Sequence, residues 1–453
     1  MHKRSRSRPL AEIMATPVDR LFVHCKQLVT LTDGPFSGPR RGAAMQALGV
    51  IDDGAVAVRD GCIVAVGPTE AIAREYAAAD ELDLTGFVVT PGFVDCHTHP
   101  VFARTREREF HMRCAGADYM AIAQQGGGIL SSMRAVRETG LDVLTELTTE
   151  HLWGFLQHGT TTVEAKTGYG LSLHDEEKSL RALGAAMAQV PLRCKRTFLG
   201  AHEFPPEYRD NREAYVEIVC KEMIPRLAKL ADYCDVFAEP GVFDRVQSLR
   251  VLSAARAEGL RLRLHADELQ PMGGAELAVE LRADSADHLG KISEQGIAAM
   301  AASTTTAVLL PGTGFFLGKD IYAPARRMIE AGCIVAIATD FNPGSCHTQS
   351  MTLIHTLACV KLKMTPAEVL TASTINAAFS LQLDREVGTL HPGKRADLAV
   401  LELPSYEAVG YAFGGNPVVM TIADGEPVCV NTSDRSPDPF TGSTRSRAPR
   451  TDD

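Results

Sequence analysis

Between residues 87 and 390 the chain repeats one pattern: a short apolar run, a polar loop, and a longer segment with helical spacing of its apolar positions. Short apolar runs of this kind are typical of buried strands. We expect eight strands, at 88–95, 160–165, 194–201, 235–238, 262–265, 285–288, 306–310 and 334–339. Residues 175–189 and 215–231 are among the predicted helices between them. Eight strands alternating with helices predict an α/β fold, a (β/α)8 TIM barrel, with an open doubly wound sheet as the alternative.

The two flanks of this repeat are rich in strand-forming residues instead. Residues 55–66 contain two such runs joined by Asp60 and Gly61, and an Asp-Gly pair in this position is a strong hairpin signal. Similar runs return at 396–401 and 418–425. Because both flanks share this pattern, we expect them to build one small, sandwich-like β-domain together.

The chain ends are rich in polar residues and have few apolar ones, so they cannot offset the entropy cost of ordering. The predicted division is a disordered tail over 1–18, the first part of the β-domain over 19–86, the barrel over 87–390, the second part of the β-domain over 391–430, and a disordered tail over 431–453.

The composition of the chain argues against two classes of binding partner, nucleic acids and membranes. The 453 residues carry a formal charge of −10, which argues against nucleic acid as a partner, because binding to phosphates needs clustered Lys and Arg. No apolar run approaches the roughly 20 residues that span a bilayer, so no membrane contact is expected. The 11 cysteines include no Cys-x-x-Cys pair and no dense framework, which favours reduced thiols and a cytoplasmic location.

His97 and His99 end the first predicted strand with one residue between them. Side chains at positions i and i+2 of a strand point to the same side, so two such imidazoles can bind one metal ion. The alternative is a turn with two solvated histidines.

Other residues that can bind a metal or take part in catalysis also lie at the ends of predicted strands. Active sites of (β/α)8 barrels lie at the C-terminal ends of the strands. The residues at these predicted ends are His97 and His99 after the first strand, His202 after the third, His265 at the fifth, His288 at the sixth and Asp340 after the eighth. Imidazoles with a carboxylate suit zinc or iron. Such an ion lowers the pKa of a water molecule to near neutrality, which predicts hydrolysis.

Several motifs resemble the amidohydrolase superfamily: PGFVDCHTH at 91–99, the Thr-Asp pair at 339–340, and GTLHPGKRADL at 388–398. Others are similar to one family within it, the imidazolonepropionases of histidine degradation. These are REREF at 106–110, QGGGI at 125–129, KTGYGL at 166–171, FLGAH at 198–202, HADE at 265–268 and DFNPGS at 340–345. The resemblance covers about residues 19–430.

The resemblance implies a reaction and a set of roles. Water would open the ring of the small molecule 4-imidazolone-5-propanoate to give N-formimidoyl-L-glutamate. The implied metal ligands are His97, His99, His265 and Asp340, which the strand-end pattern alone does not separate from His202 and His288. The implied substrate residues are Arg106, Tyr119, Tyr169, His202, Glu268, Asn342, Gly344 and Ser345.

Physical chemistry gives several of these roles a reason. A guanidinium such as that of Arg106 offers a propionate carboxylate a planar, charge-assisted contact. Glu268, three residues after His265, can move a proton between water and the leaving ring nitrogen, with Asp267 as its competitor. His288 can donate to the ring carbonyl and stabilise the oxyanion.

Some superfamily members bridge two metals with a modified lysine at the end of the fourth strand. Lys166 ends the second predicted strand, and Glu239 follows the fourth. We therefore expect one ion per chain, Zn²⁺ or Fe³⁺, and an ion-pairing or pocket-orienting role for Lys166.

Three functions remain in competition at this point. The first is imidazolonepropionase activity, the second is another amidohydrolase activity such as deamination of a nitrogen heterocycle, and the third is a non-catalytic barrel. Intact ligands and an intact acid/base residue argue against the third. A homodimer is considered, but no residue pattern decides the oligomeric state.

Overall fold

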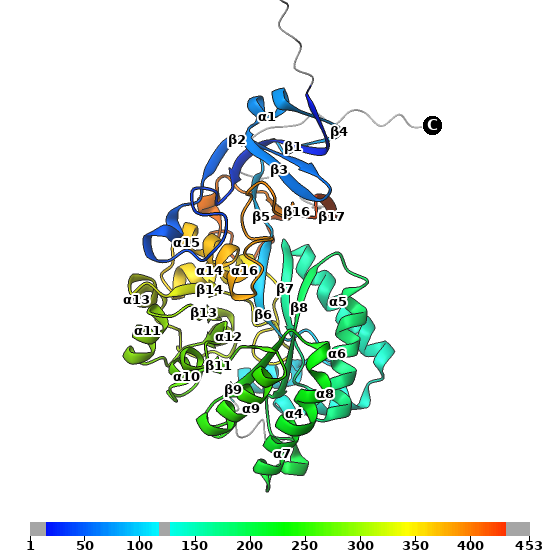
Figure 1. The fold of residues 1–453 in the computed structure, drawn as a ribbon, viewed down its shortest axis with the longest axis vertical. Coiled ribbons are helices and arrows are strands. Elements are labelled where there is room, and N and C mark those ends of the chain that lie inside the picture. The colour runs from blue at the N-terminus through cyan, green and yellow to red at the C-terminus, as the bar shows by residue number, and fades with distance from the viewer. Residues whose placement is uncertain (1–14, 117–126, 432–453) are drawn as a thin grey trace, which may run out of the picture.

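The computed structural model describes residues 15–116 and 127–431. Parallel strands form a barrel in sequence order, with neighbours hydrogen-bonded from β6 through to β14 (Figure 1). Its strands are β6 (Phe93–Thr98), β7 (Thr160–Lys166), β8 (Arg193–Ala201), β9 (Tyr233–Ala238), β10 (Arg261–Leu262) with β11 (His265–Ala266), β12 (Ser285–His288), β13 (Thr306–Leu309) and β14 (Ile334–Ile337). Most of their residues are buried, as expected for parallel strands covered on both faces.

The barrel closes between its first and last strands. The backbone N–H of Asp340 donates to the carbonyl of His97 at 3.1 Å, and the N–H of His99 donates to that of Phe341 at 2.8 Å. An open doubly wound sheet would leave these two edges apart, so the predicted barrel is confirmed and the alternative is wrong.

Helices cover the outside of the barrel (Figure 1). They include α5 (Leu141–Gln157), α6 (Leu173–Met187), α7 (Arg212–Ile218), α8 (Ile224–Leu227), α9 (Arg245–Ala257), α10 (Gly274–Glu280), α11 (Glu294–Ala301), α12 (Pro311–Phe316) and α13 (Ala325–Glu330). Further helices are α1 (Thr69–Glu75), α2 (Glu107–Cys114), α4 (Ile129–Glu138), α14 (Met351–Lys361), α15 (Pro366–Ala372) and α16 (Ile375–Ser380). The largest apolar core lies between strands and helices, as with Val236, Leu252 and Ile337.

The predicted helix at 215–231 is not continuous. A π-helical turn, Val219–Met223, separates α7 from α8, and a short 3₁₀ turn, Ala228–Leu230, follows. Pro225 is the physical reason, because its ring lacks an N–H and clashes with the carbonyl four residues earlier, which a wider turn relieves.

The predicted strand 88–95 is two strands in two different sheets. β5 (Val88–Pro91) pairs with strands of the small domain, and β6 begins at Phe93 in the barrel. The change falls at Pro91 and Gly92, where a Cβ on Gly92 would overlap the side chain of Thr161 on β7. Because β5 leads directly into β6, the small domain lies at the end of the barrel opposite to the carboxyl ends of the strands (Figure 1).

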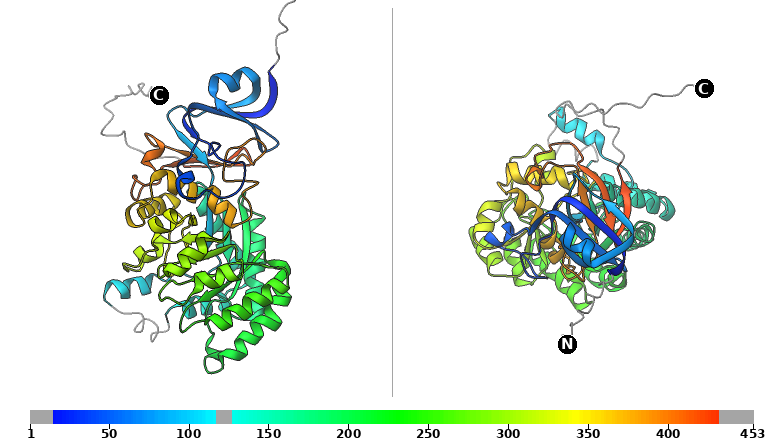
Figure 2. Two further views of the ribbon diagram at one scale, coloured as in Figure 1. Left: turned by 60° about the vertical axis from the view of Figure 1, so that its left-hand side comes forward. Right: turned by 90° about the horizontal axis from the view of Figure 1, so that it is seen from above.

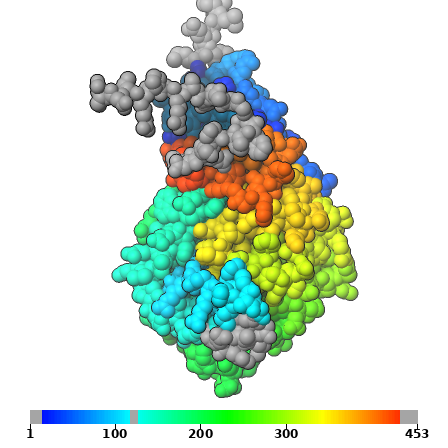
Figure 3. Space-filling view, turned by 180° about the vertical axis from the view of Figure 1, so that it is seen from behind, coloured from blue at the N-terminus to red at the C-terminus, as the bar shows by residue number. Residues whose placement is uncertain are grey.

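Both ends of the chain build the small domain, as predicted. Its sheet has the order β17-β16-β15-β5-β1-β2-β3, with β4 also paired to β1. The remaining strands are β1 (Thr16–Val29), β2 (Val50–Arg59), β3 (Cys62–Pro68), β4 (Tyr76–Asp83), β15 (Leu398–Leu401), β16 (Val418–Ala423) and β17 (Glu426–Val430). Figure 2, seen from above, shows blue and orange strands side by side, and Figure 3 shows the two parts as one cap on the barrel.

Two local predictions can be compared with this sheet. The hairpin at 55–66 is confirmed: Arg59 pairs with Cys62, and Asp60 and Gly61 both have positive φ, as the tight turn requires. The predicted N-terminal tail, 1–18, extends too far, because β1 begins at Thr16 and pairs there with β4. The rest of that tail and the C-terminal tail from residue 432 lie outside the described residues.

Within residues 15–116 and 127–431, no helix is both long enough and apolar enough to cross a membrane.

Candidate metal centre and active site

The barrel brings the six strand-end residues together at one end. His97 lies on β6, His265 on β11 and His288 on β12, while His99, His202 and Asp340 follow β6, β8 and β14. All six side chains are buried. The ring of His97 has its centroid 4.6 Å from that of His265, and the ring of His99 stacks on His202 at 5.3 Å.

The ligand atoms of these residues converge. The Nε2 atoms of His97 and His99 lie 3.3 Å apart, and Oδ1 of Asp340 lies 3.6 Å from the first and 3.5 Å from the second. His97 also belongs to a second group, with His265 and His288, and the ligand atoms of each group lie within 4.8 Å of one another. Buried nitrogen lone pairs this close to one another and to a carboxylate fit a metal cation.

Carboxylates behind two of the histidines fix their orientation. Nδ1 of His97 lies 2.6 Å from Oδ2 of Asp287, and Nδ1 of His265 lies 3.0 Å from Oδ2 of Asp235. A carboxylate on Nδ1 leaves Nε2 as the donor atom toward a metal. Burial, with a smaller contribution from positively charged neighbours, lowers the pKa of His97 well below its ordinary value. The neutral imidazole is the form that binds a metal.

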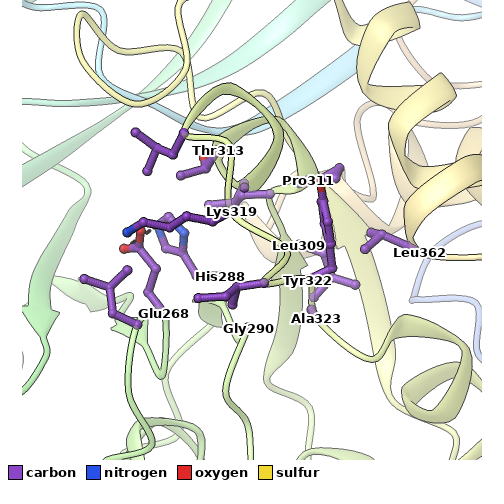
Figure 4. A pocket seen from close by; sticks show the side chains of 15 residues that line it. Glu268, His288, Gly290, Leu309, Pro311, Thr313, Lys319, Tyr322, Ala323 and Leu362 are labelled. Carbon is purple, nitrogen blue, oxygen red and sulfur yellow. Dashed lines mark ion pairs between the residues drawn. The ribbon is translucent and has the colours of Figure 1, made fainter. Parts of the chain in front are cut away.

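The structure distinguishes Glu268 from Asp267. Both carboxylate oxygens of Asp267 accept hydrogen bonds, at 2.7 to 3.1 Å, from backbone N–H groups of the segment 272–275. Oε2 of Glu268 lies 3.7 Å from Nε2 of His288, and 17% of the Glu268 side chain is exposed. Figure 4 shows Glu268 and His288 facing one pocket, with Lys319 beside them. Burial raises the pKa of Glu268 and so makes its carboxylate a stronger base, while its exposed fraction leaves it accessible from the pocket.

Two positions in the site have backbone conformations that side chains rarely adopt. His288 has a φ of 75° and Asp340 a φ of 55°, both in the left-handed region. Such conformations cost about 1–3 kcal/mol each and cluster at functional sites. Thr313 on α12 donates a hydrogen bond to Oδ2 of Asp340 and so fixes the second oxygen of this carboxylate.

Arg106 directly precedes α2, and the Nε/Nη2 edge of its guanidinium is paired with Glu109. Its Nε and Nη2 donate to the two carboxylate oxygens of Glu109 at 3.0 and 2.6 Å. Its Nη1 points to Gly344, where any Cβ would overlap the guanidinium. These two contacts use the N–H of Nε and one N–H of Nη2, so the second N–H of Nη2 and both of Nη1 remain free of Glu109. The bidentate contact with a substrate carboxylate therefore stays a prediction, now for the Nη1/Nη2 edge.

Asn342 organises the loop after the last strand. Its Oδ1 accepts hydrogen bonds from the N–H groups of Gly344 and Ser345 at 2.8 and 2.7 Å, and its Nδ2 donates to the carbonyl of Asp340 at 2.6 Å. Asn342 thus links the three predicted loop residues to the backbone of Asp340, which is a predicted metal ligand.

Tyr169 and His202 lie together on the other side of His99. The ring centroid of Tyr169 is 5.3 Å from that of His202 and 6.2 Å from that of His99. Nδ1 of His202 lies 3.0 Å from the carbonyl of Gly168. Both side chains are buried at the site. The remaining predicted substrate residue, Tyr119, lies outside the described residues.

Lys166 is fully buried and ion-paired. Its Nζ lies 2.7 Å from Oε1 of Glu164 and 3.0 Å from Oδ2 of Asp235. The fourth barrel strand, β9, is followed by Glu239, which leaves no lysine where a bridging one would stand. These positions agree with an ion-pairing role and with a single metal.

Sequence reasoning missed several residues of this region. Asp235, Asp287 and Arg263 lie beneath the predicted ligands, and Arg113 on α2 donates to the carbonyl of Gly344 at 3.2 Å. One signal was available for the first three, because charged residues within otherwise apolar strands need partners inside the barrel.

Solved structures with the same fold include an adenosine deaminase from Xanthomonas campestris with bound zinc, with a TM-score of 0.70 and 21% identity over 92% of this chain and 94% of that one. A guanine deaminase from E. coli has a TM-score of 0.70 and 16% identity over 91% of this chain and 99% of the other. At such identities the likeness shows the fold alone.

Sequence comparison is more specific. Residues 88–428 match the amidohydrolase family, and residues 54–79 match a bacterial imidazolonepropionase-like composite domain. The imidazolonepropionase of Symbiobacterium thermophilum is 48% identical over 90% of this chain and 97% of its own length. That of Geobacillus kaustophilus is 46% identical over 90% and 97%. The chain therefore belongs to the imidazolonepropionase family of hydrolases, within the metal-dependent amidohydrolases.

Proposed function

We propose that this protein hydrolyses the ring C–N bond of 4-imidazolone-5-propanoate to give N-formimidoyl-L-glutamate, in histidine degradation. The observation that carries the proposal is 48% identity to an imidazolonepropionase along nearly the whole of both chains. The convergence of buried histidines, Asp340 and Glu268 at one end of the barrel supports it, because hydrolysis of a cyclic amide needs an activated water and a group that moves a proton.

The proposed ligands of a single Zn²⁺ or Fe³⁺ are His97, His99, His265 and Asp340. Two observations favour His265 over His288 as the third imidazole. Asp235 fixes His265 from behind, as Asp287 fixes His97, whereas Nε2 of His288 faces Glu268. When bound, the ion supplies Lewis-acid chemistry that lowers the pKa of water to near neutrality.

Glu268 and His288 are the proposed catalytic residues. The Glu268 carboxylate accepts a proton from the attacking water and delivers it to the ring nitrogen as the C–N bond breaks. His288, whose pKa burial lowers to about 4, is neutral and can donate an N–H to the carbonyl oxygen as charge develops there.

The proposed substrate contacts surround this centre. They are Arg106, Tyr119, Tyr169, His202, Glu268, Asn342, Gly344 and Ser345. The Nη1/Nη2 edge of Arg106 would contact the propionate, with Arg113 adding a second positive charge against the same loop. The rings of Tyr169 and His202 pack beside that of His99.

The proposed reaction is tested by its products. Purified protein is incubated with imidazolone propionate, and both N-formimidoyl-L-glutamate and ammonia are measured. We expect formimidoyl-glutamate without ammonia, because ring opening releases no other product. Ammonia from this substrate, or turnover only of a nitrogen heterocycle that is deaminated, would favour a deaminase. No turnover by metal-loaded protein would favour a non-catalytic barrel.

A second prediction concerns the substrate carboxylate. Arg106→Ala removes a charge-assisted contact, expected to weaken binding by roughly 1.5–3 kcal/mol. Arg104, exposed and paired with Glu138 at 3.3 Å, provides the control, and Arg104→Ala should bind normally. Affinities are measured for a substrate analogue and for its counterpart without the carboxylate.

The two changes together form a double-mutant cycle. If Arg106 contacts the carboxylate, the analogue without it should bind wild type and Arg106→Ala about equally. Additive losses would show that Arg106 does not contact this group.

We further propose a cytoplasmic location, since all 11 cysteines are free thiols, which are kept reduced there. The homodimer stays a prediction.

A further inference from the structure

Five charged side chains lie inside the barrel beneath the proposed metal ligands. They are Glu164, Lys166, Asp235, Arg263 and Asp287, and none has measurable exposure to solvent. They come from β7, β9, the β10–β11 strand and β12. Charges are costly to bury without partners. Their arrangement therefore needs a reason beyond packing.

Two of the carboxylates hold proposed metal ligands. Asp235 contacts His265 twice: its Oδ1 accepts a hydrogen bond from the backbone N–H at 3.2 Å, and its Oδ2 lies 3.0 Å from Nδ1. Oδ2 of Asp287 lies 2.6 Å from Nδ1 of His97. Each carboxylate therefore sets the orientation of the imidazole ring that it contacts.

Lys166 connects these two carboxylates. Its Nζ lies 3.0 Å from Oδ2 of Asp235 and 4.0 Å from Oδ2 of Asp287, and Glu164 accepts a hydrogen bond from it at 2.7 Å. An ammonium between two carboxylates offsets their mutual repulsion and keeps both in place. Without it, Asp235 keeps only the backbone hydrogen bonds to its Oδ1 and Asp287 keeps Arg263, so we expect both carboxylates to hold their histidines less firmly.

Arg263 has a narrower role in the same cluster. Its Nη2 donates to the carbonyl of Cys96 at 2.8 Å and lies 3.4 Å from Oδ2 of Asp287. Of the two carboxylates behind the histidines, Arg263 lies within ion-pair distance of Asp287, whereas Lys166 lies within that distance of both.

We infer that Lys166 is a positioning residue for the metal: by holding Asp235 and Asp287 against His265 and His97, it makes both imidazoles present Nε2 to one ion. The inference rests on the ligand set of the proposed function, but not on the substrate.

The test is metal affinity in Lys166→Met, measured by chelator competition with Zn²⁺. Outer partners of metal ligands typically contribute about 10–100-fold to affinity, and we expect a loss in this range. Lys394 is the matched control, because it is also fully buried but donates to the carbonyls of Asp384 and Val387, away from the site. Lys394→Met should destabilise the protein while its zinc affinity stays within about twofold of wild type.

A second variant covers the case in which Lys166→Met does not fold. The double variant Glu164→Gln/Lys166→Met removes one charge of each sign and so leaves the net charge of the cluster unchanged. Compared with Glu164→Gln alone, it should show the same loss of zinc affinity and an altered visible spectrum with Co²⁺, which reports ligand geometry.

Wild-type affinity and an unchanged Co²⁺ spectrum in the double variant would overturn the inference and leave Lys166 as charge balance alone. Wild-type protein that binds no ion would instead refute the proposed ligand set, and the inference with it. A failure of the substrate assay alone, with these metal results as expected, would refute only the proposed reaction.

Discussion

Glu268→Gln is expected to keep its metal and to lose about 10²- to 10⁴-fold in turnover, the usual contribution of a positioned acid/base group. The amide has nearly the same shape as the carboxylate but cannot accept the proton from water. Glu268 is not a proposed metal ligand, so metal content should stay at the wild-type value. Turnover and metal per chain are measured on the same preparations.

Glu280→Gln is the control for this exchange, because Glu280 ends α10 at the surface, paired with Arg245 at 2.6 Å. It should behave as wild type. Near-normal turnover in Glu268→Gln would assign the proton-transfer role to His288 instead. Asp267 is not available for it, because its carboxylate already accepts hydrogen bonds from three backbone N–H groups.

Asp340→Ala should release or misplace the ion and reduce activity to the background of the assay. Asp340 is the one anionic residue of the proposed ligand set, and its Oδ1 lies 3.5 to 3.6 Å from Nε2 of His99 and His97. Metal per chain, measured by elemental analysis, should fall from one in wild type to well below one, with turnover falling in parallel.

Asp320→Ala provides the control, as Asp320 is almost fully exposed on the loop after α12. It should retain one ion and normal turnover. Full occupancy and normal turnover in Asp340→Ala would contradict its role as a ligand. Two ions per wild-type chain would contradict the single-metal site.

The local sequence pattern was enough to predict much of the secondary structure. The strand predicted at 285–288 is β12 without change, and the Asp60-Gly61 hairpin has the expected turn. These succeed because burial and turn geometry are determined by neighbours in sequence. The strand at 88–95 and the helix at 215–231 were wrong in detail, because the chain changes sheets at Gly92 and Pro225 interrupts the helix.

The sequence also indicated where in the fold the candidate metal-binding and catalytic residues lie. Residues such as His97, His265 and Asp340 could be assigned to one site because parallel strands of a barrel end on the same side. The sequence did not distinguish Glu268 from Asp267, since both lie after the same strand. The hydrogen bonds of Asp267 to the following loop made that distinction.

What the sequence determined by itself is therefore the type of fold, the family resemblance and the end of the barrel at which the chemistry lies. Only the tertiary structure decided that Glu109 pairs with the Nε/Nη2 edge of Arg106, and that Asp287 holds His97 across 190 positions of the chain. Periodicity reports the side of a strand or helix on which a residue lies. It carries no information on which distant charge meets that residue inside the closed barrel, because this depends on how all eight strands are brought together.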